Sequence, residues 1–523
     1  MVKVNEGEMV MIESPTEFAD KIGLEYAKGS NQSDKKERGQ FFTPIPIAKF
    51  MANLAKTNNT HYDILDPGFG TGILTSALIE HQIESNSELK SVVITAYETD
   101  ESIILYAEQT LQNLKLWAIS KGVELSYKLI SGDFIASNYQ YLSEPAENYD
   151  IIITNPPYYK LGKDHISIQQ CKELVSGQPN IYSFFLGIGA ALLREDGDII
   201  SITPRSFSSG RYFQAFRDFF FSKVNLMHVH LFDSRRSSFS RDKVLQEVLI
   251  LKATKNSSYI PTNVMISSSG GMSDLQNPII KTYDITMVID SKSTQKVVHI
   301  PINDNEEQVL NLVLGWDCKL ADLNINISTG PVVTFRATKF LVDHDAKLEA
   351  EFCPLIRLHN VTKMELKYPY KLKGKADKIL ILKESMPILL PNKDYVLLRR
   401  FSTKDDKSRL IAAPYLSAVT QSDFVGIDNA VNYIYRKNGT LNYDEIMGLS
   451  ALLNCNLFDT YFRIFNGNVN VSATELREMR FPNLETIKEI GNQIIAENNL
   501  SNDRVNEIIN NMFFKLTPQQ KDK

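Results

Sequence analysis

The stretch Asp63-Ile64-Leu65-Asp66-Pro67-Gly68-Phe69-Gly70-Thr71-Gly72-Ile73-Leu74 reads as a buried strand, a glycine-rich turn and the start of a helix. Glycine lets the backbone turn tightly and lets a ligand approach it closely. The spacing is not the GxGxxG of dinucleotide-binding enzymes, which weakens a nicotinamide interpretation. The stretch therefore predicts a strand–turn–helix unit of an α/β fold with a ligand at the strand end.

Two further apolar strands end in acidic residues. The run Val92–Asp100 places Glu98 at a strand end, where a carboxylate suits a ribose diol in nucleotide-binding folds. The run Leu129–Phe134 places Asp133 where it could reach an adenine amino group. Each acid alone could equally be a helix cap or a solvated turn residue. Their order along successive strand ends favours one shared site.

A fourth strand, Tyr149–Thr154, is followed by Asn155-Pro156-Pro157-Tyr158. The Asn155 side-chain oxygen and the Pro156 carbonyl can accept hydrogen bonds from a planar NH2 group, which makes its nitrogen nucleophilic. Pro157 restrains the backbone before it, and Tyr158 offers a face for a base to stack on. These parts predict methylation of a planar amine. The alternative is a plain strand-terminating turn, since Asn and Pro are common there.

The four motifs together resemble the gamma class of amino DNA methyltransferases, which take the methyl group from S-adenosylmethionine. The resemblance includes Gly39–Met51, and it implies that Thr43 holds the methionine part of the cofactor. It also implies that Phe239, within Ser238–Val244, packs against a flipped base. The cofactor-binding residues that the resemblance implies are Thr43, Asp66, Gly68, Gly70, Gly72, Glu98, Asp133 and Asn155.

Distal segments such as Ser328–Val333, Tyr395–Ser402 and Asn468–Arg477 resemble recognition domains of type II modification methyltransferases of the PstI/BsuBI-like group. The resemblance implies an α/β, Rossmann-like S-adenosylmethionine-dependent methyltransferase domain with a C-terminal mixed α+β target-recognition domain. It also implies double-stranded DNA as substrate and a separate restriction endonuclease that shares its site. Alternation of strands and helices from about 39 to 255 independently predicts a parallel sheet covered on both faces.

The pattern of apolar and polar residues along the chain predicts five segments. They are an N-terminal helical segment and linker (1–38), a catalytic domain (39–255), a connecting segment rich in Ser and Gly (256–309), a target-recognition domain (310–485) and a helical tail (486–523). The stretch 159–178 lacks periodicity and reads as a mobile loop that orders on substrate binding.

Bulk properties exclude several classes of protein. The chain has 523 residues, 43% of them hydrophobic, which suits two or three packed domains. We expect no membrane span and no signal peptide, because no long apolar run is present. Four scattered cysteines suit a reducing cytoplasm, and no metal-binding spacing is present. Cys171 is not expected to act as a nucleophile, and the chain lacks the Pro-Cys pair of cytosine-C5 enzymes.

The formal net charge of −5 is unusual for a DNA-binding protein. The basic residues gather, however, between Leu355 and Leu410, where fourteen Lys and Arg stand against six acids. Such a stretch can neutralise phosphates and offer arginine to base edges, although a solvated lysine-rich surface is the alternative. The candidate DNA-binding residues are Arg399, Arg400, Arg336 and Lys404.

The reaction that these motifs indicate is methyl transfer to N6 of an adenine in duplex DNA. The base must leave the stack, because the amine is not accessible within a base pair. Asn at the head of the NPPY motif favours adenine, and cytosine N4 is the nearest alternative. An enzyme acting on RNA or on a protein glutamine, or a DNA-binding module without activity, also stays open.

Overall fold

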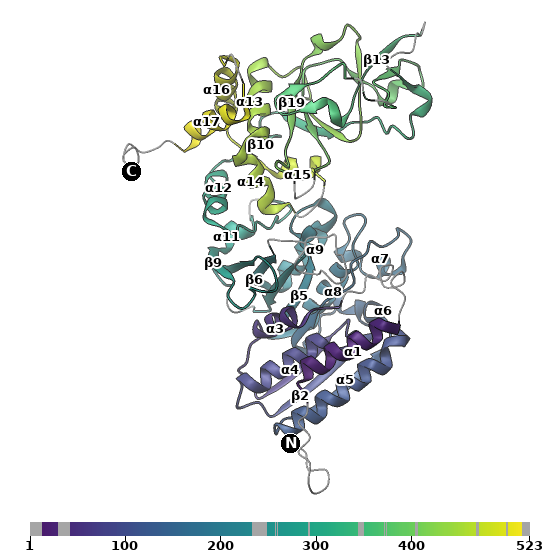
Figure 1. The fold of residues 1–523 in the computed structure, drawn as a ribbon, viewed down its shortest axis with the longest axis vertical. Helices are drawn as coiled ribbons and strands as arrows, with labels where there is room; N and C mark the ends of the chain where they lie inside the picture. The colour runs from purple at the N-terminus through teal and green to yellow at the C-terminus, as the bar shows by residue number, and fades with distance from the viewer. Residues whose placement is uncertain are drawn as a thin grey trace, which may run out of the picture. The chain divides into compact units, whose positions relative to one another are not determined.

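The computed structural model describes residues 13–29, 42–232, 248–256, 258, 260–290, 293–343, 350–370, 372, 374–402, 406–466, 470–497 and 500–514. The chain forms two compact units, Met1–Ile302 and Asn303–Lys523. In Figure 1 the first unit runs from purple to teal and the second from teal through green to yellow.

A nine-stranded sheet with the order β3-β2-β1-β4-β5-β7-β6-β8-β9 is the centre of the first unit. The strands from β3 to β5 are parallel, and β7 runs antiparallel to both β5 and β6. This order confirms the predicted α/β fold with a central, mostly parallel sheet. The strands are β1 (His61–Asp66), β2 (Ser91–Glu98), β3 (Glu124–Ser131), β4 (Tyr149–Thr154), β5 (Leu193–Pro204), β6 (Asn225–Phe232), β7 (Val248–Thr254), β8 (Asn263–Ser269) and β9 (Ile279–Asp284).

Helices cover both faces of this sheet, which explains why its central strands are apolar along their length. Ile64 on β1 and Ile152 on β4 are fully buried. Every residue of α8 is buried, so it is a core helix rather than a surface helix. The helices are α1 (Pro15–Gly29), α3 (Ile45–Asn53), α4 (Ile73–Ser85), α5 (Glu101–Ser120), α6 (Phe134–Asn138), α7 (Ile166–Gln170), α8 (Tyr182–Leu192), α9 (Gln214–Lys223) and α11 (Ile285–Val288).

The N-terminal helix α1 belongs to the first unit rather than standing apart from it. Figure 1 shows α1 beside α4 and α5, and it contacts both. Thr16 Oγ1 donates to Glu80 Oε2 on α4 at 2.6 Å, and Tyr26 Oη donates to Asp100 Oδ2 at 3.3 Å. The expected linker Ser30–Arg38 lies outside the described residues.

The stretch expected to connect the two domains contributes β8 and β9 to the catalytic sheet. The serine-rich sequence of this stretch is typical of a linker, but the hydroxyls of Ser267 and Ser269 have partners inside the protein. Ser267 Oγ lies 2.7 Å from His228 Nε2 and 2.8 Å from His230 Nδ1, and Ser269 Oγ lies 3.1 Å from His230 Nε2. Pairing with histidines on β6 makes a serine-rich strand compatible with burial.

The segment after the NPPY motif also differs from the expected mobile loop. It contains α7 and the 3-10 turn Lys172–Leu174, and Leu161, Cys171 and Leu174 are buried in the core. Elements this short leave no periodicity in the sequence, which is why the pattern read as a loop. Burial raises the pKa of the Cys171 thiol to about 12, which disfavours its thiolate.

The buried histidines of β6 are expected to make the first unit sensitive to acid. Burial lowers the pKa of His228 to about 4 and that of His230 to about 3. An unfolded histidine has a pKa of about 6.5, so below that pH the unfolded chain binds more protons and the folded state loses stability. We expect a loss of about 2–4 kcal/mol between pH 6.5 and pH 5. Urea unfolding at several pH values measures it.

His230→Asn, which keeps a hydrogen-bonding side chain but cannot titrate here, is the control for this prediction. The variant should show a shallower fall in unfolding free energy over the same pH range. A fall as steep as that of the unsubstituted protein would mean that other groups cause the acid sensitivity.

The second unit contains two main sheets, with the orders β11-β21-β18-β19 and β12-β16-β13-β20-β17. The strands are β10 (Cys318–Lys319), β11 (Ile325–Thr329), β12 (Leu341–Val342), β13 (Phe352–Ile356), β14 (Val361–Thr362), β15 (Glu365–Leu366), β16 (Lys378–Leu380), β17 (Leu390–Pro391), β18 (Tyr395–Arg399), β19 (Ala412–Tyr415), β20 (Phe424–Ile427), β21 (Val431–Arg436) and β22 (Arg480–Phe481). The helices are α12 (Asp304–Leu314), α13 (Tyr443–Asn454), α14 (Asn456–Phe465), α15 (Ala473–Glu478), α16 (Leu484–Ile495) and α17 (Asn502–Phe513).

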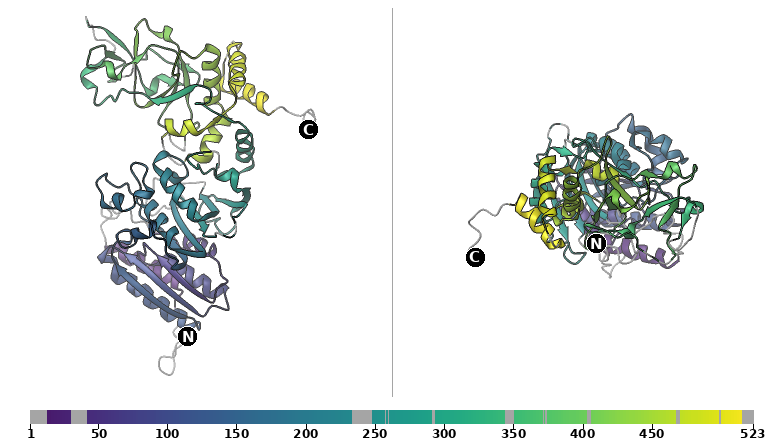
Figure 2. Two further views of the ribbon diagram at one scale, coloured as in Figure 1. Left: turned by 180° about the vertical axis from the view of Figure 1, so that it is seen from behind. Right: turned by 90° about the horizontal axis from the view of Figure 1, so that it is seen from above.

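The expected C-terminal tail is part of this second unit. Helices α16 and α17 pack against α13 and against each other (Figure 2, yellow). The backbones of α13 and α16 touch at two glycines. A Cβ built on Gly448 would lie 2.0 Å from the Ile487 carbonyl oxygen, and one on Gly491 would lie 1.9 Å from the Asp444 carbonyl oxygen. Only glycine permits this crossing.

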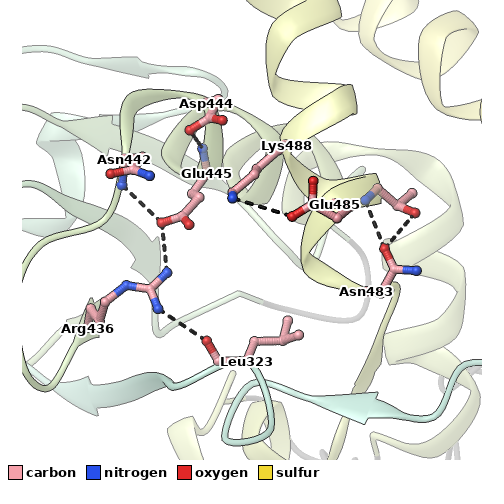
Figure 3. A network of polar contacts seen from close by, with 9 residues as sticks. Leu323, Arg436, Asn442, Asp444, Glu445, Asn483, Glu485 and Lys488 are labelled. Atoms are coloured by element: carbon pink, nitrogen blue, oxygen red, sulfur yellow. Dashed lines mark hydrogen bonds and ion pairs between the residues drawn. The ribbon is translucent and has the colours of Figure 1, made fainter.

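A buried carboxylate joins α13 to the sheet that precedes it (Figure 3). Glu445 Oε2 accepts a hydrogen bond from Arg436 Nη2 at 2.8 Å and another from the Asn442 backbone N–H at 3.0 Å. Arg436 also donates from Nη1 to the Leu323 carbonyl at 3.3 Å. The start of α13 is therefore fixed to the end of β21 by charged and backbone groups together.

Candidate active site

A pocket of about 860 Å³ opens at the carboxyl ends of β1, β2 and β4. Parallel strands bring these ends to one edge of the sheet, which is where α/β folds bind ligands. Of the residues predicted from sequence, it is lined by Thr43, Gly68, Gly70, Glu98, Asp133, Asn155 and Pro157.

The glycine turn exposes its backbone to this pocket. Gly70 has φ +55°, and a Cβ built on it would meet nothing within 4 Å. Its N–H donates to Glu98 Oε2 at 2.9 Å, and the Phe69 N–H donates to the Tyr97 carbonyl at 2.9 Å. The turn is therefore held by the end of β2 while leaving room for a ligand against its backbone.

Asp66 and Gly72 do not line the pocket, although the motif names them. Asp66 is buried and accepts hydrogen bonds from Thr75 Oγ1 at 2.8 Å and from the Gly68 N–H at 3.3 Å. Burial raises the pKa of its carboxyl group to about 7. Gly72 has φ +82°, and a Cβ there would lie 2.4 Å from the Phe69 ring. Both residues shape the turn from behind.

Glu98 is a fixed acceptor at the pocket wall. Its Oε1 accepts the N–H groups of Thr99 and Asp100, both at 2.8 Å, while Oε2 accepts only that of Gly70 among these backbone groups. Two carboxylate oxygens offer about four acceptor positions, so Oε2 keeps one for a ligand hydroxyl. Burial raises the pKa of Glu98, and the three N–H bonds oppose that rise.

Asp133 divides its carboxylate between the fold and the pocket. Its Oδ1 caps α6 by accepting the N–H groups of Ile135 at 2.7 Å and Ala136 at 3.1 Å. Those bonds leave Oδ2 for a ligand donor at the pocket edge. Asp133 can therefore cap α6 with one oxygen and bind a ligand with the other.

The Asn155 amide lies between two hydroxyl groups. Its Nδ2 donates to Thr43 Oγ1 at 3.1 Å, and its Oδ1 is hydrogen-bonded to Tyr158 Oη. Tyr158 Oη also lies 2.8 Å from the Ile202 carbonyl oxygen on β5. A phenol carries one proton, so it cannot donate to both carbonyl oxygens at once. Because an amide oxygen has two lone pairs, Asn155 Oδ1 can accept a hydrogen bond from a substrate amine in addition to its contact with Tyr158.

Tyr158 is placed differently from the expected stacking residue. Its side chain is buried, its ring packs edge-on at 6.4 Å from Tyr182, and it does not line the pocket. Its neighbour Tyr159 is 37% exposed and lines the pocket instead. Stacking of Tyr158 on a base stays a prediction, and so does the role of Phe239, which lies outside the described residues.

Sequence reasoning gave no site role to the apolar part of the pocket. Ile181 and Phe185 at the start of α8, together with Phe134 on α6, form an apolar wall. In the sequence, the feature that points to this wall is the spacing of four residues between Ile181 and Phe185, which puts both side chains on one face of a helix. Such a wall suits a flat ring, whereas the acids suit its polar edges.

The Thr43 hydroxyl has a testable positioning role. Thr43→Val keeps the shape of the side chain but removes the acceptor of the Asn155 Nδ2 proton. We expect kcat to fall about 10-fold, since one hydrogen bond that orients the amide is lost, while Thr43→Ser stays near wild type. Methyl-transfer kinetics and cofactor calorimetry measure the two effects. Weaker cofactor binding with unchanged kcat would show that the hydroxyl serves the cofactor alone.

The structure separates the two adjacent arginines of the second unit. Arg399 Nε donates to the Val361 carbonyl at 2.7 Å, and burial lowers the pKa of its guanidinium. Arg400 Nη1 donates to the Asn429 carbonyl at 3.0 Å, at the turn between β20 and β21. Arg336 is exposed on another loop of the unit. Lys404 lies outside the described residues.

Two further observations concern the described part of the chain. It contains no cluster of three or more His, Cys, Asp or Glu side chains arranged to hold a metal ion. None of its helices is both long and apolar enough to span a bilayer.

Known proteins resemble this chain along most of its length. A family model described as Eco57I restriction-modification methylase matches residues 47–239. The type II methyltransferase M.PstI of Providencia stuartii is 32% identical over 481 residues, covering 91% of this chain and 93% of that protein. M.BsuBI of Bacillus subtilis is 32% identical, with 88% and 91% covered. A cryo-EM structure of a DrdV–DNA complex has a TM-score of 0.48 at 14% identity, covering 92% of this chain and 59% of that chain.

The sheet order and the strand-end pocket define the class of Rossmann-like α/β proteins that bind a ligand at the carboxyl ends of their strands. Within that class, the extended similarity to M.PstI and M.BsuBI decides the family. The chain belongs to the type II DNA methyltransferases of restriction–modification systems.

Proposed function

We propose that this protein transfers a methyl group from S-adenosylmethionine to N6 of an adenine flipped out of duplex DNA. The methylated sequence is the one that a separate, cognate restriction endonuclease cleaves, and the protein acts in the cytoplasm. The observation that carries this proposal is the Asn155 amide, which is held between Thr43 and Tyr158 at one side of the pocket and directly precedes Pro156.

The pocket residues fit S-adenosylmethionine. The free acceptor position on Glu98 Oε2 suits a ribose hydroxyl, and the apolar wall of Ile181 and Phe185 suits a purine ring. The open space over Gly70 lets the backbone approach the ligand. When bound, this cofactor supplies a methyl group on a positively charged sulfur.

Asn155 and Pro156 act on the target amine. The Asn155 Oδ1 and the Pro156 carbonyl accept the two N–H groups, which turns the nitrogen lone pair away from the ring and toward the methyl carbon. Transfer forms one N–C bond, breaks one S–C bond and releases one amine proton to solvent. Both acceptors are fixed before the substrate arrives, because Thr43 and Tyr158 hold the amide and Pro157 restrains the backbone.

Sequencing of DNA from cells that express this chain tests the proposal, if modified bases are detected directly. We expect 6-methyladenine at one short sequence and none in cells without the gene. 4-Methylcytosine at a fixed sequence would keep the enzyme class but overturn the adenine assignment. DNA free of both modifications, from cells containing folded protein, would overturn the proposed function.

A further inference from the structure

Two arginine–phenylalanine pairs surround one turn of the second unit, the Asp428–Ala430 turn between β20 and β21. The Arg336 guanidinium lies 5.4 Å from the centre of the Phe335 ring, and the Arg400 guanidinium lies 5.4 Å from that of Phe401. Phe335 is 73% exposed, the highest value among the large apolar side chains in the described part of the chain, and Phe401 is 44% exposed.

Backbone hydrogen bonds tie both pairs to this turn. The Asn429 N–H donates to the Val332 carbonyl at 2.9 Å, and the Val332 N–H donates to the Ile427 carbonyl at 3.0 Å. On the other side, the Arg400 N–H donates to the Ala430 carbonyl at 2.9 Å. The two pairs are therefore neighbours of one turn, although Arg336 and Arg400 are 64 positions apart in the sequence.

The loop that carries Phe335 is closely packed at its base. A Cβ built on Gly330 would lie 2.3 Å from the Asp428 carbonyl oxygen, so the backbones touch there. Val332, Ala337 and Phe340 are buried in a small core of this unit. Because the backbone is anchored, only the side-chain torsions of the exposed ring must be ordered on a partner, which costs less entropy than ordering a mobile loop.

The charge of the loop that carries Phe335 is positive. The loop from 330 to 340 contains Arg336 and Lys339 and no acid. Within the turn, Asp428 is buried and lies 3.4 Å from Arg357 Nε, which neutralises it. Cations beside exposed aromatic rings fit a partner that offers both phosphates and flat bases.

We propose that Phe335 inserts between base pairs of the bound duplex as a wedge, with Arg336 on an adjacent phosphate and the Arg400–Phe401 pair beside it. This proposal rests on the proposed function, because it takes duplex DNA as the substrate. Apolar wedges with flanking arginines unstack DNA in this way, and local unstacking lowers the cost of removing a base from the helix.

The test scans 2-aminopurine through the methylated sequence and its flanks, one position at a time. With wild-type protein we expect the wedge to raise the fluorescence at one base-pair step, in addition to the rise at the flipped target. Phe335→Ala should lose the wedge rise and show a kcat/KM about 10- to 100-fold lower, whereas Phe335→Trp should keep the rise. Arg336→Ala should weaken binding to every duplex and reduce the salt slope by about one charge.

Phe352→Ala is the matched control. Phe352 is 38% exposed and lies under Lys378, at 4.5 Å, but it stands at the far end of β13 from Ile356, whose carbonyl accepts from Asp428. This variant should behave like wild type. Identical 2-aminopurine profiles for wild type and Phe335→Ala would overturn the proposal. It would also be overturned if Phe335→Ala bound DNA more weakly while wild-type protein raised the fluorescence at no base-pair step besides the flipped target. The fluorescence readouts need no methyl transfer, so failure of the proposed function would appear separately, as wild-type protein that leaves DNA unmethylated.

Discussion

Replacing Asn155 by alanine is expected to reduce methyl transfer at least about 1000-fold. The amide oxygen is one of two acceptors for the target amine, and its contribution arises in the transition state rather than in binding. Affinities for S-adenosylmethionine and for DNA should change less than about 3-fold. Single-turnover kinetics with excess enzyme, beside calorimetry and DNA-binding titrations, measure the three quantities.

Asn155→Asp is the control for this substitution, because it keeps an acceptor oxygen toward the amine. It should retain more activity than the alanine variant. If cofactor affinity fell as far as the rate in Asn155→Ala, the residue would support the pocket wall rather than the reaction.

Gly491→Ala is expected to destabilise the second unit by about 3 kcal/mol or more. The new methyl group would overlap the Asp444 carbonyl oxygen, so α13 and α16 would have to move apart along their crossing. The overlapping atoms are the new Cβ and a backbone carbonyl oxygen, so no side-chain rotation relieves the overlap. Urea unfolding followed by tryptophan fluorescence measures the change, since Trp316 packs against Phe458 and Phe513 in this unit.

Gly162→Ala is the control, because a Cβ there meets nothing within 4 Å and the residue has an ordinary backbone conformation. It should leave the unfolding curve within about 0.5 kcal/mol of wild type. An equally small effect of Gly491→Ala would mean that the two helices adjust without cost.

The catalytic half could be predicted from sequence because its chemistry lies at strand ends. A buried parallel strand is an apolar run, and the polar residue that follows it is placed by topology alone. Glu98, Asp133 and Asn155 reach one pocket for this reason. Asp66 shows the limit, since its position in the motif could not reveal that Thr75 and the turn would bury it.

Contacts between distant residues could not be read in the same way. Ser267 looks like a linker residue until His228 and His230 are placed beside it. The sequence around Gly448 does not reveal that the Ile487 carbonyl oxygen packs against this glycine. The adjacent arginines seemed equivalent in the sequence, yet Arg399 is the last residue of β18 and Arg400 lies in the bend that follows it. Arg399 therefore reaches the Val361 carbonyl, whereas Arg400 reaches the turn at Asn429.

The packing of the loop from 330 to 340 has a consequence for redesigning which sequence is methylated. Its fold depends on Gly330, Val332 and Ala337, while Thr334, Phe335 and Arg336 contribute little to the core beneath them. If this loop binds DNA as we propose, a combinatorial library restricted to those three positions would sample new DNA contacts on an unchanged backbone. Most members of such a library should fold, so selection by restriction cleavage of unprotected plasmids would act on recognition rather than on stability.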